Sequence, residues 1–452
     1  MVGAVAVDFG ASSGRFAAGW IEDGQIRFDI VDQIPHGPIE RNGRLEWDID
    51  RLLDLCLAAE AHAGSRFETA TLGIDTWGVD HGFIGSDGKS LGAPVCYRDT
   101  SHLEAFELLA PHRARLYELT GIQHQPFNTI CQLLARKLKD PELPKKVARW
   151  YILPDFLGYL IAGEQNMELT QASTSQLLGL DGTWSEEAFD MIGWPVPEIQ
   201  PSLPGKVGSY LRTDNVRIAH VGSHDTASAV CGFGQLSDDQ VFLNVGTWSL
   251  VGSVIDQPLA TPEAEAAMFT NERTVDGRVR FLKNIPGFYV INRIHEELGL
   301  KMSVPEWLTK ADAVDERIDL LHPDFYNPPS MVKICASLAG RKPVSHAEWA
   351  GLALSSLTST IAKQPLELER LTGRRFTSLR VGGGGSQSQS FCQSLADESG
   401  LPVYAGPAEA TVLGNLALQF LANGQFSSHD EMYRAVSRSA DTRVYRPGER
   451  LT

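Results

Sequence analysis

The first segment whose residue types could do chemistry is a short polar turn after an apolar run. Residues 2–9 alternate as a half-buried strand should and reach Asp8 near their end, and residues 10–15 read Gly-Ala-Ser-Ser-Gly-Arg. Glycines in such a turn let backbone N–H groups face a phosphate, the hydroxyls add donors, and Arg15 adds a fixed positive charge. A carboxylate at Asp8 can hold Mg²⁺ through water. The segment predicts a phosphate-binding turn, with an ordinary Gly/Ser hairpin as the alternative.

A second candidate is a run of four glycines, residues 382–385, followed by Ser386. Consecutive glycines are entropically costly, and they are useful where a ligand must approach the backbone closely beside a helix N-terminus. An apolar strand pattern precedes the run and a helical pattern follows it, which disfavours a flexible linker. We therefore expect a nucleotide to approach this run.

Asp225 is the candidate proton acceptor. It lies in Gly-Ser-His-Asp-Thr-Ala-Ser-Ala, residues 222–229, where an apolar strand pattern ends and a small-residue helix begins. A carboxylate exposed at such a point can accept a hydroxyl proton while that oxygen attacks phosphorus. The alternative is a helix N-cap, for which Asp is a favoured residue.

A tryptophan flanked by acids forms the fourth candidate, in Gly-Ile-Asp-Thr-Trp-Gly-Val-Asp at residues 73–80. An aromatic ring can cover the C–H face of a sugar while carboxylates accept from its hydroxyls, so Asp75 and Trp77 could bind a sugar. A core tryptophan beside a solvated acid is the alternative. Gly88-Lys89-Ser90 resembles the end of a Walker A loop, but that motif needs glycine where this chain has Phe83.

Composition excludes several other classes of protein. The 452 residues carry a net charge of −16 without a basic cluster, which disfavours nucleic acids and anionic membranes as partners. No stretch approaches the roughly 18 apolar residues of a membrane span, and the N-terminus lacks a signal peptide's basic region, so we expect a cytoplasmic protein. The six cysteines form no C-x-x-C pair and are expected to be buried, reduced thiols. No obligate protein partner is evident.

The order of apolar patterns predicts an α/β fold with a mixed sheet. Three strand patterns, a helix over about 50–62 and a further strand open the chain, and residues 101–194 are mostly helical, as in an inserted lobe. The pattern breaks near residues 232–237. Beyond it, residues 244–248 (Asn-Val-Gly-Thr-Trp) repeat the hairpin design of residues 8–12, which favours two similarly folded domains, 1–232 and 233–452. Chance convergence of two hairpins is the alternative.

Taken together, these motifs resemble the FGGY family of carbohydrate kinases. The resemblance covers residues 5–424 and rests on VAVDFGASSGR, GIDTWGVD, PFNT, HDTASAV, GTWSLVG, LKN and AGPAEATVLGN. It implies two ribonuclease-H-like domains of the actin-like ATPase superfamily flanking a cleft, with a helical insertion in the N-terminal domain. The family implies that the N-terminal domain holds mainly the sugar and the C-terminal domain mainly ATP.

The resemblance also implies roles for individual residues. Asp225 is the catalytic base, and Asp8 lies near Mg²⁺. The expected nucleotide contacts are Ala11, Ser12, Ser13, Gly14, Arg15, Thr247, Asn292, Gly383, Gly384 and Gly385. The expected sugar contacts are Asp75, Trp77, Gly78, His224, Asp225, Thr226 and Asn284. Two departures leave the nucleotide contacts open: Asn292 stands where the most similar branch has glutamine, and four glycines stand where the family commonly has three and then a cysteine.

The implied reaction is ATP-dependent phosphorylation of a ketose, with L-rhamnulose to its 1-phosphate as the first expectation. L-fuculose and xylulose are alternative substrates, because kinases for them share the aspartate and the phosphate turns. A catalytically silent sugar sensor is an alternative of another class, although a sensor has no need of a base between His224 and Thr226. An actin-like ATPase would hydrolyse ATP without any sugar.

Overall fold

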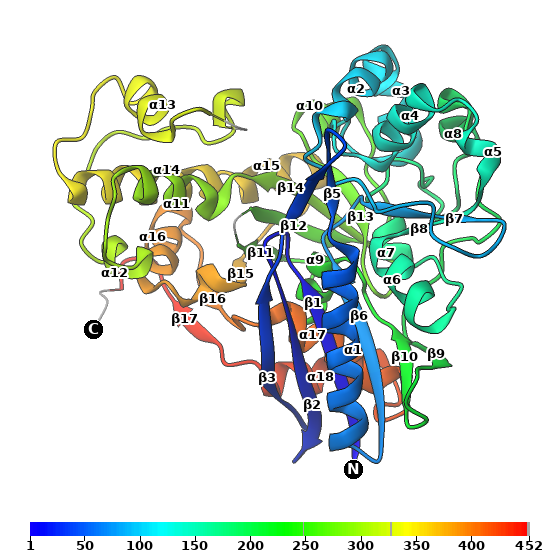
Figure 1. Ribbon diagram of the computed structural model, residues 1–452. Coiled ribbons are helices and arrows are strands. Elements are labelled where there is room, and N and C mark those ends of the chain that lie inside the picture. Colours follow the sequence, from blue (N-terminus) through cyan, green and yellow to red (C-terminus); the bar gives the residue numbers. More distant parts are fainter. Residues whose placement is uncertain (247, 326–327, 450–452) are drawn as a thin grey trace. The chain divides into compact units, whose positions relative to one another are not determined.

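The computed structural model describes residues 1–246, 248–325 and 328–449, and the chain forms two compact units (Figure 1). Unit 1 consists of Met1–Gln235, Ile255–Phe281 and Thr411–Ser439. Unit 2 consists of Leu236–Val254, Leu282–Ala410 and Ala440–Thr452. Thr247, one of the predicted nucleotide contacts, lies outside the described residues.

Unit 1 is built on a six-stranded mixed sheet. Its strand order is β3 (Gln25–Pro35), β2 (Ser13–Glu22), β1 (Val2–Phe9), β6 (Thr69–Thr76), β10 (Val216–His220) and β9 (Lys206–Tyr210). Strands β1, β6 and β10 are parallel, whereas β2 and β3 on one side and β9 on the other are antiparallel to their neighbours. The predicted opening order of three strands, a helix and a fourth strand is confirmed for this sheet, but two short strands at residues 38–41 and 44–47, which were not predicted, pair with each other between β3 and the helix.

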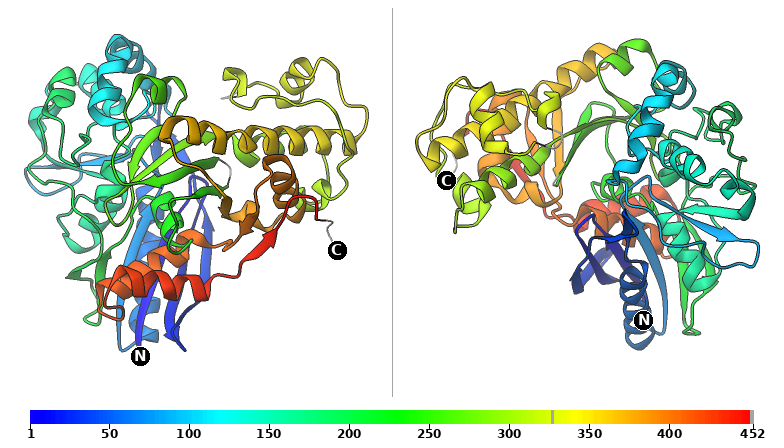
Figure 2. Two further views of the ribbon diagram at one scale, coloured as in Figure 1. Left: turned by 180° about the vertical axis from the view of Figure 1, so that it is seen from behind. Right: turned by 45° about the horizontal axis from the view of Figure 1, so that its top comes forward.

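The two faces of this sheet are covered by helices from distant parts of the sequence. α1 (Ile49–Arg66) packs on the face that carries the apolar side chains of Val5, Val7 and Phe9. α17 (Ala410–Ala422) and α18 (His429–Ser439), orange to red in Figure 2, lie on the other face. Gly19 allows the close approach of α17, since a Cβ there would lie 2.8 Å from Leu416.

The helical insertion is confirmed and has its own apolar core. Its helices are α2 (Leu103–Leu109), α3 (Arg113–Thr120), α4 (Thr129–Lys139), α5 (Leu143–Lys146), α6 (Leu153–Ala162), α7 (Leu169–Ala172) and α8 (Glu186–Ile192). This part of the chain also contains a strand that was not predicted, β8 (Val147–Ile152), which pairs antiparallel with β7 (His81–Gly85). Its partner lies some 65 residues earlier, so local periodicity gave no sign of it. The remaining elements of unit 1 are β4 (Pro38–Arg41), β5 (Arg44–Trp47), α9 (Asp225–Cys231), α10 (Pro262–Ala266) and β13 (Thr270–Arg273).

The second sheet repeats the plan of the first. Its order is β13, β14 (Val279–Ile285), β12 (Ser249–Ile255), β11 (Gln240–Val245), β15 (Ser378–Gly382), β16 (Val403–Ala405) and β17 (Arg443–Tyr445), of which β13 and the start of β14 are counted with unit 1. β12 is antiparallel to β11, β11, β15 and β16 are parallel, and β17 is antiparallel to β16. This sequence of directions matches β2, β1, β6, β10 and β9, so the predicted hairpin repeat marks two domains of one design.

Six helices complete unit 2: α11 (Gly287–Glu297), α12 (Val304–Leu308), α13 (Met331–Leu338), α14 (His346–Ala362), α15 (Gln364–Thr372) and α16 (Gln389–Ser399). Within the described part of the chain, no helix combines the length and the apolar character needed to cross a bilayer. All six cysteines are buried and unpaired, as predicted.

Candidate active site

Three carboxylates lie where the parallel strands of unit 1 end. Asp8 on β1 is in register with Asp75 on β6, and an isolated parallel bridge joins Thr76 to His224, which precedes Asp225. Ligands of open α/β sheets bind at the carboxyl ends of the parallel strands. The fold therefore brings together Asp8, Asp75 and Asp225, which the sequence had marked in three separate motifs.

Asp75 differs from the other two acids because its side chain is completely buried. Burial and the nearby charge of Asp8 raise the pKa of Asp75 well above its usual range, and the hydrogen bond donated by Asn415 Nδ2 (2.6 Å) opposes that rise. Asp75 thus lies beside Asp8 on the neighbouring strand, and Asn415 of α17 holds its carboxylate. Its predicted sugar contact would have to be made through a side chain without exposed surface.

The predicted phosphate turn joins β1 to β2. The Gly10 N–H donates to Ser13 O (2.9 Å), and Arg15 donates through Nε and Nη2 to Asp8 Oδ2 (3.1 and 2.9 Å). Ser12 is exposed and Ser13 and Ala11 are half-buried. Gly14 is needed for packing, since a Cβ there would lie 2.5 Å from the Phe9 ring. The turn thus pairs a cation with a carboxylate at an open edge of the sheet.

Asp225 is the first residue of α9, and 28% of its side chain is exposed. Partial burial raises the pKa of Asp225 to about 6, the Asp8 charge acts in the same direction, and His224 and Arg280 oppose it. The carboxylate is therefore ionised at neutral pH and within reach of solvent. Both features suit a proton acceptor.

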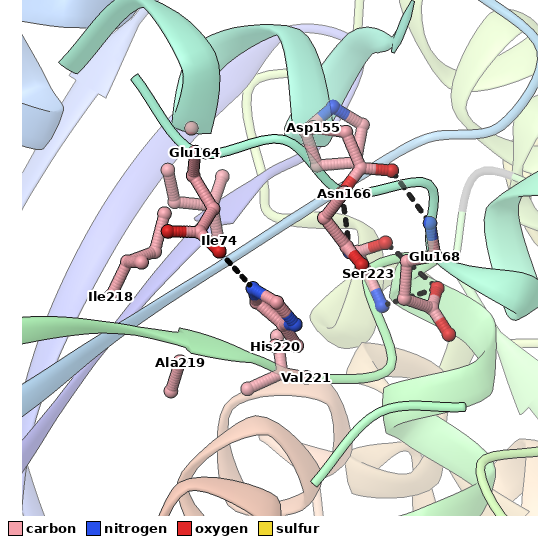
Figure 3. A pocket seen from close by; sticks show the side chains of 12 residues that line it. Ile74, Asp155, Glu164, Asn166, Glu168, Ile218, Ala219, His220, Val221 and Ser223 are labelled. Carbon is pink, nitrogen blue, oxygen red and sulfur yellow. Dashed lines mark hydrogen bonds and ion pairs between the residues drawn. The ribbon is translucent and has the colours of Figure 1, made fainter. Parts of the chain in front are cut away.

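A buried acid that the sequence analysis missed supports the Asp225 loop from behind. Glu168 accepts hydrogen bonds from Ser223 N (3.1 Å) and Ser223 Oγ (2.8 Å) and from Thr170 Oγ1 (2.5 Å), as Figure 3 shows in part. Thr170 Oγ1 in turn accepts from His224 N (3.2 Å). These bonds fix the backbone on which His224 and Asp225 stand. The only sign of Glu168 in the sequence is an acid before the polar run 170–176.

A second missed residue, Gln171, ties the two predicted sugar-binding segments together. Its buried Nε2 donates to Ser223 O (2.9 Å), Trp77 O (3.1 Å) and Thr76 O (3.2 Å). One amide therefore sets the spacing between the backbone around Trp77 and the backbone around Asp225.

Trp77 lies in an aromatic cluster and is 7% exposed. Its ring centroid is 4.1 Å from that of Trp47 and 5.7 Å from that of His36. Asp80, fully buried, accepts from Trp77 Nε1 (2.8 Å) and Trp47 Nε1 (2.6 Å), and burial raises the pKa of Asp80 to about 6. The indole N–H of Trp77 is therefore already used, and only a ring edge or face remains for a ligand.

Gly78 and Val79 follow Trp77 in an unusual backbone. Val79 has a φ of +73°, which β-branched residues rarely adopt. Its N–H donates to Thr174 Oγ1 (3.1 Å) and its carbonyl accepts from Thr129 Oγ1 (2.7 Å). Strained backbone held by two such bonds is common at ligand sites.

The remaining predicted residues belong to unit 2. Asn284 is exposed on β14, and Asn292 is half-buried on α11. Gly383 has a φ of +76°, and a Cβ on Gly385 would lie 2.3 Å from Val245 Cγ1, so local backbone conformation and packing explain why both residues are glycine. A Cβ on Gly384 would meet no atom within 4 Å. Gly384 is therefore the glycine that the chain's own packing does not explain.

The side chains at this edge of the sheet suit magnesium only as part of a larger donor set. Among the described residues, no group of three or more His, Cys, Asp or Glu side chains is arranged to hold a metal ion alone. Mg²⁺ in phosphoryl-transfer enzymes is usually held by one or two carboxylates, waters and substrate phosphates. The carboxylates of Asp8 and Asp225, at the ends of parallel strands of one sheet, are of the kind that such a partial donor set contains.

Comparisons with known proteins place this site in a family. The N-terminal domain of the FGGY family of carbohydrate kinases matches residues 4–233, and its C-terminal domain matches residues 241–423. The chain belongs to the FGGY family of carbohydrate kinases. It is a sugar phosphotransferase, and the resemblance found in the motifs is confirmed.

Individual relatives agree with this assignment. The rhamnulokinase of Bacillus subtilis is 33% identical over 98% of this chain and 95% of its own length. The ligand-bound xylulose kinase of Lactobacillus acidophilus has a TM-score of 0.83 at 17% identity, covering 99% of this chain and 94% of that one. The glycerol kinase of Plasmodium falciparum with ADP has a TM-score of 0.79 at 14% identity, with coverage of 99% and 94%. At such identities the two structures show the shared fold.

Proposed function

We propose that the protein transfers the γ-phosphoryl group of ATP to the 1-hydroxyl of L-rhamnulose, with Asp225 as the base. The observation that carries the choice of sugar is the 33% identity to a rhamnulokinase over nearly the whole of both chains. The observation that supports the base is an ionised carboxylate, 28% exposed, at the carboxyl end of the parallel strands.

The proposed chemistry follows from the polarity of the site. The sugar hydroxyl donates a hydrogen bond to Asp225, which accepts the proton late, because phosphoryl transfer passes through a loose transition state. Catalysis then depends mainly on alignment and on stabilising the phosphate charge. Arg15 and the N–H groups of residues 11–14 supply that stabilisation from the protein. Mg²⁺, when bound near Asp8, neutralises charge on the phosphate oxygens.

The two halves of the sequence are proposed to share the substrates. Residues 1–232 hold mainly the sugar, through His224, Thr226, Gly78 and the Trp77 region, and also the phosphates through the turn at residues 11–15. Residues 233–452 hold mainly ATP. Gly384, which no neighbouring side chain crowds, is proposed as the point where adenosine approaches the backbone. Asn284 is proposed to contact the sugar, and Asn292 is proposed to contact the nucleotide. We also propose that the enzyme works in the cytoplasm, where ATP is made available.

The test is ADP release measured with Mg-ATP and a panel of L-rhamnulose, L-fuculose, L-xylulose and D-xylulose. We expect kcat/KM for L-rhamnulose to exceed that for the other ketoses by at least about tenfold. Asp225→Asn should lower kcat by about 10²- to 10⁴-fold while the sugar still binds, since removing a general base has that effect. Asp214→Asn, at an exposed acid on the turn before β10, is the matched control and should leave kcat unchanged.

Each contrary result points to a specific error. Another preferred ketose would keep the reaction and correct the substrate. Turnover of Asp225→Asn within a few-fold of the parent would remove Asp225 as the base. ATP hydrolysis without any dependence on sugar, or no ADP release with any ketose, would refute the proposed reaction.

A further inference from the structure

An arginine that no sequence motif marked is buried beside the proposed base. Arg280 lies in β14, in the otherwise apolar run Val-Arg-Phe-Leu, and its side chain has no exposed surface. A buried guanidinium is unfavourable unless its N–H groups are paired. All the partners described below belong to unit 1, as Arg280 itself does.

The guanidinium is directed at the two residues that flank Asp225. Nη1 donates to Thr226 Oγ1 (2.7 Å) and Nη2 donates to His224 Nδ1 (3.1 Å). Nη2 also lies 3.0 Å from Glu272 Oε2, and Nε donates to Arg273 O (3.0 Å). Glu272 therefore balances the charge of Arg280, and both anchor the start of α9 to β13 and β14.

The contact with Arg280 favours one of the two nitrogens of His224 as the carrier of the proton. Arginine has donors only, so Nδ1, facing Nη2, must offer its lone pair. In the neutral ring the proton is then on Nε2, which lies 3.4 Å from Asp225 Oδ1. Thr226 Oγ1 is 3.2 Å from both ring nitrogens. In the ring plane such a position would overlap the carbon between the nitrogens, so the oxygen lies out of the plane and aligns with neither lone pair. Because this oxygen already accepts from Arg280, its hydrogen is left to donate.

We propose that Arg280 is a positioning residue that fixes the hydrogen-bond polarity of the sugar site, so that His224 Nε2–H and Thr226 O–H act as donors and Asp225 is the acceptor. This proposal rests on the proposed function, in which these residues meet a sugar. Two donors suit the lone pairs of a carbonyl and a hydroxyl oxygen of a ketose. One ionised acceptor suits the hydroxyl that is phosphorylated.

Two carboxylates close to His224 would stabilise its protonated form, and an imidazolium is therefore the result that would contradict the proposal. Glu272 Oε2 lies 3.3 Å from Nδ1, and Asp225 faces Nε2. An imidazolium would donate to both carboxylates and would place an N–H against Arg280. Three further acids act on this cluster: Glu168 through Arg280, and Asp8 and Asp75 through Asp225.

The first test uses the unaltered protein. With ¹⁵N-labelled histidine, the His224 signals are assigned by their loss in His224→Asn, which leaves eleven of the twelve histidines. At the pH of the kinetic assays, we expect an unprotonated Nδ1 and a protonated Nε2. A proton on Nδ1, whether in the other tautomer or in an imidazolium, would overturn the proposal. The outcome does not depend on turnover, so it stays separate from a failure of the proposed function.

The second test is kinetic and uses Arg280→Met together with Arg280→Lys. Loss of hydrogen bonds from a charged donor predicts a fall in kcat/KM for the sugar of about 10- to 100-fold, with KM for ATP within about twofold. The acid limb of the pH profile should move to higher pH, because Arg280 lowers the pKa of Asp225. Arg280→Lys keeps the charge but cannot reach both partners. The acid limb of its pH profile should therefore lie where it does in the parent protein, while kcat/KM for the sugar should stay low.

The matched control is Arg278→Met, two residues earlier. Arg278 pairs with Asp276 (2.8 Å) outside the site, so its loss should leave both KM values unchanged. A sugar kcat/KM within twofold of the parent in folded Arg280→Met, or an equal rise in both KM values, would overturn the proposal. If Arg280→Met fails to fold, Glu272→Gln and the histidine signals of the unaltered protein decide the matter: Glu272→Gln should keep the Nε2–H tautomer, and a change of tautomer refutes the proposal.

Discussion

Val79 allows a test of backbone strain beside the sugar site. Its φ of +73° places a β-branched residue in the left-handed region, and its side chain is only 8% exposed. Thr174 and Thr129 hold this conformation through their hydroxyls. We compare Val79→Gly with Val79→Ala, because both remove the branched side chain and only alanine retains the strain.

The expected difference can be worked out from two opposing effects. A left-handed conformation costs an L-residue about 1–2 kcal/mol relative to glycine. Glycine loses about 0.5–1 kcal/mol more than alanine through the entropy of the unfolded chain. At residue 79 the two effects oppose each other, so Val79→Gly should be the more stable variant by about 0.5–1 kcal/mol. At an ordinary position only the entropy remains and the order reverses.

Val95 provides the ordinary position. It is 5% exposed and does not have a positive φ. We expect Val95→Gly to be less stable than Val95→Ala, so the two glycine–alanine differences should themselves differ by about 1–2 kcal/mol. Calorimetry of thermal unfolding measures this as a difference of about 1–2 °C, because the entropy of unfolding per residue gives roughly 1 °C per kcal/mol for a chain of 452 residues. If alanine is the more stable replacement at both positions, the argument from strain is refuted.

Three further predictions concern the rest of the site. Because the pKa of Asp225 is raised to about 6 and the base must be ionised, kcat/KM should fall about tenfold per pH unit below pH 6 and level off above it; a flat profile down to pH 5 would contradict this. Gly384→Ala should leave thermal stability unchanged and raise KM for ATP. Gly385→Ala, whose Cβ would lie 2.3 Å from Val245, should lower the thermal stability; equal stabilities of the two variants would show that the crowding at Gly385 is absent. Gln171→Met should destabilise the protein by about 1–2 kcal/mol and raise KM for the sugar, since the carbonyls of Trp77 and Ser223 each lose one of two donors and keep only the one from Thr76. Thermal unfolding and sugar titration measure the two effects, and a variant with the stability and KM of the parent would contradict the prediction.

What the sequence predicted were features encoded within short segments. The turn after Asp8, the strand before Asp225 and the hairpin repeat at residue 244 each combine a local periodicity with small or polar residues at its end. The topology then explains why these segments meet, since parallel neighbours end at the same edge of a sheet. The inserted helical lobe was predicted for the same reason, as its amphipathic pattern is local.

What the sequence did not predict depends on contacts between distant residues. Arg280 reads as one charge in an apolar strand, and its meaning comes from His224, 56 residues earlier. Asn415 supports Asp75 across 340 residues, and β8 is a strand because β7 is beside it. The positive φ of Val79 could not be predicted from the sequence either, because β-branched residues rarely adopt a positive φ.

The discontinuous make-up of unit 1 has a consequence for biosynthesis. Residues 1–235 leave the ribosome long before α17 and α18, which cover one face of the first sheet and supply the Asn415 partner of Asp75. About 200 residues must still be added, which takes roughly 10–40 s at 5–20 residues per second. During that interval the nascent sheet presents an uncovered apolar face and a buried acid without its amide. Asp8, Asp75 and Asp225 can therefore assume their final arrangement only after Asn415 and the rest of residues 411–439 have been synthesised.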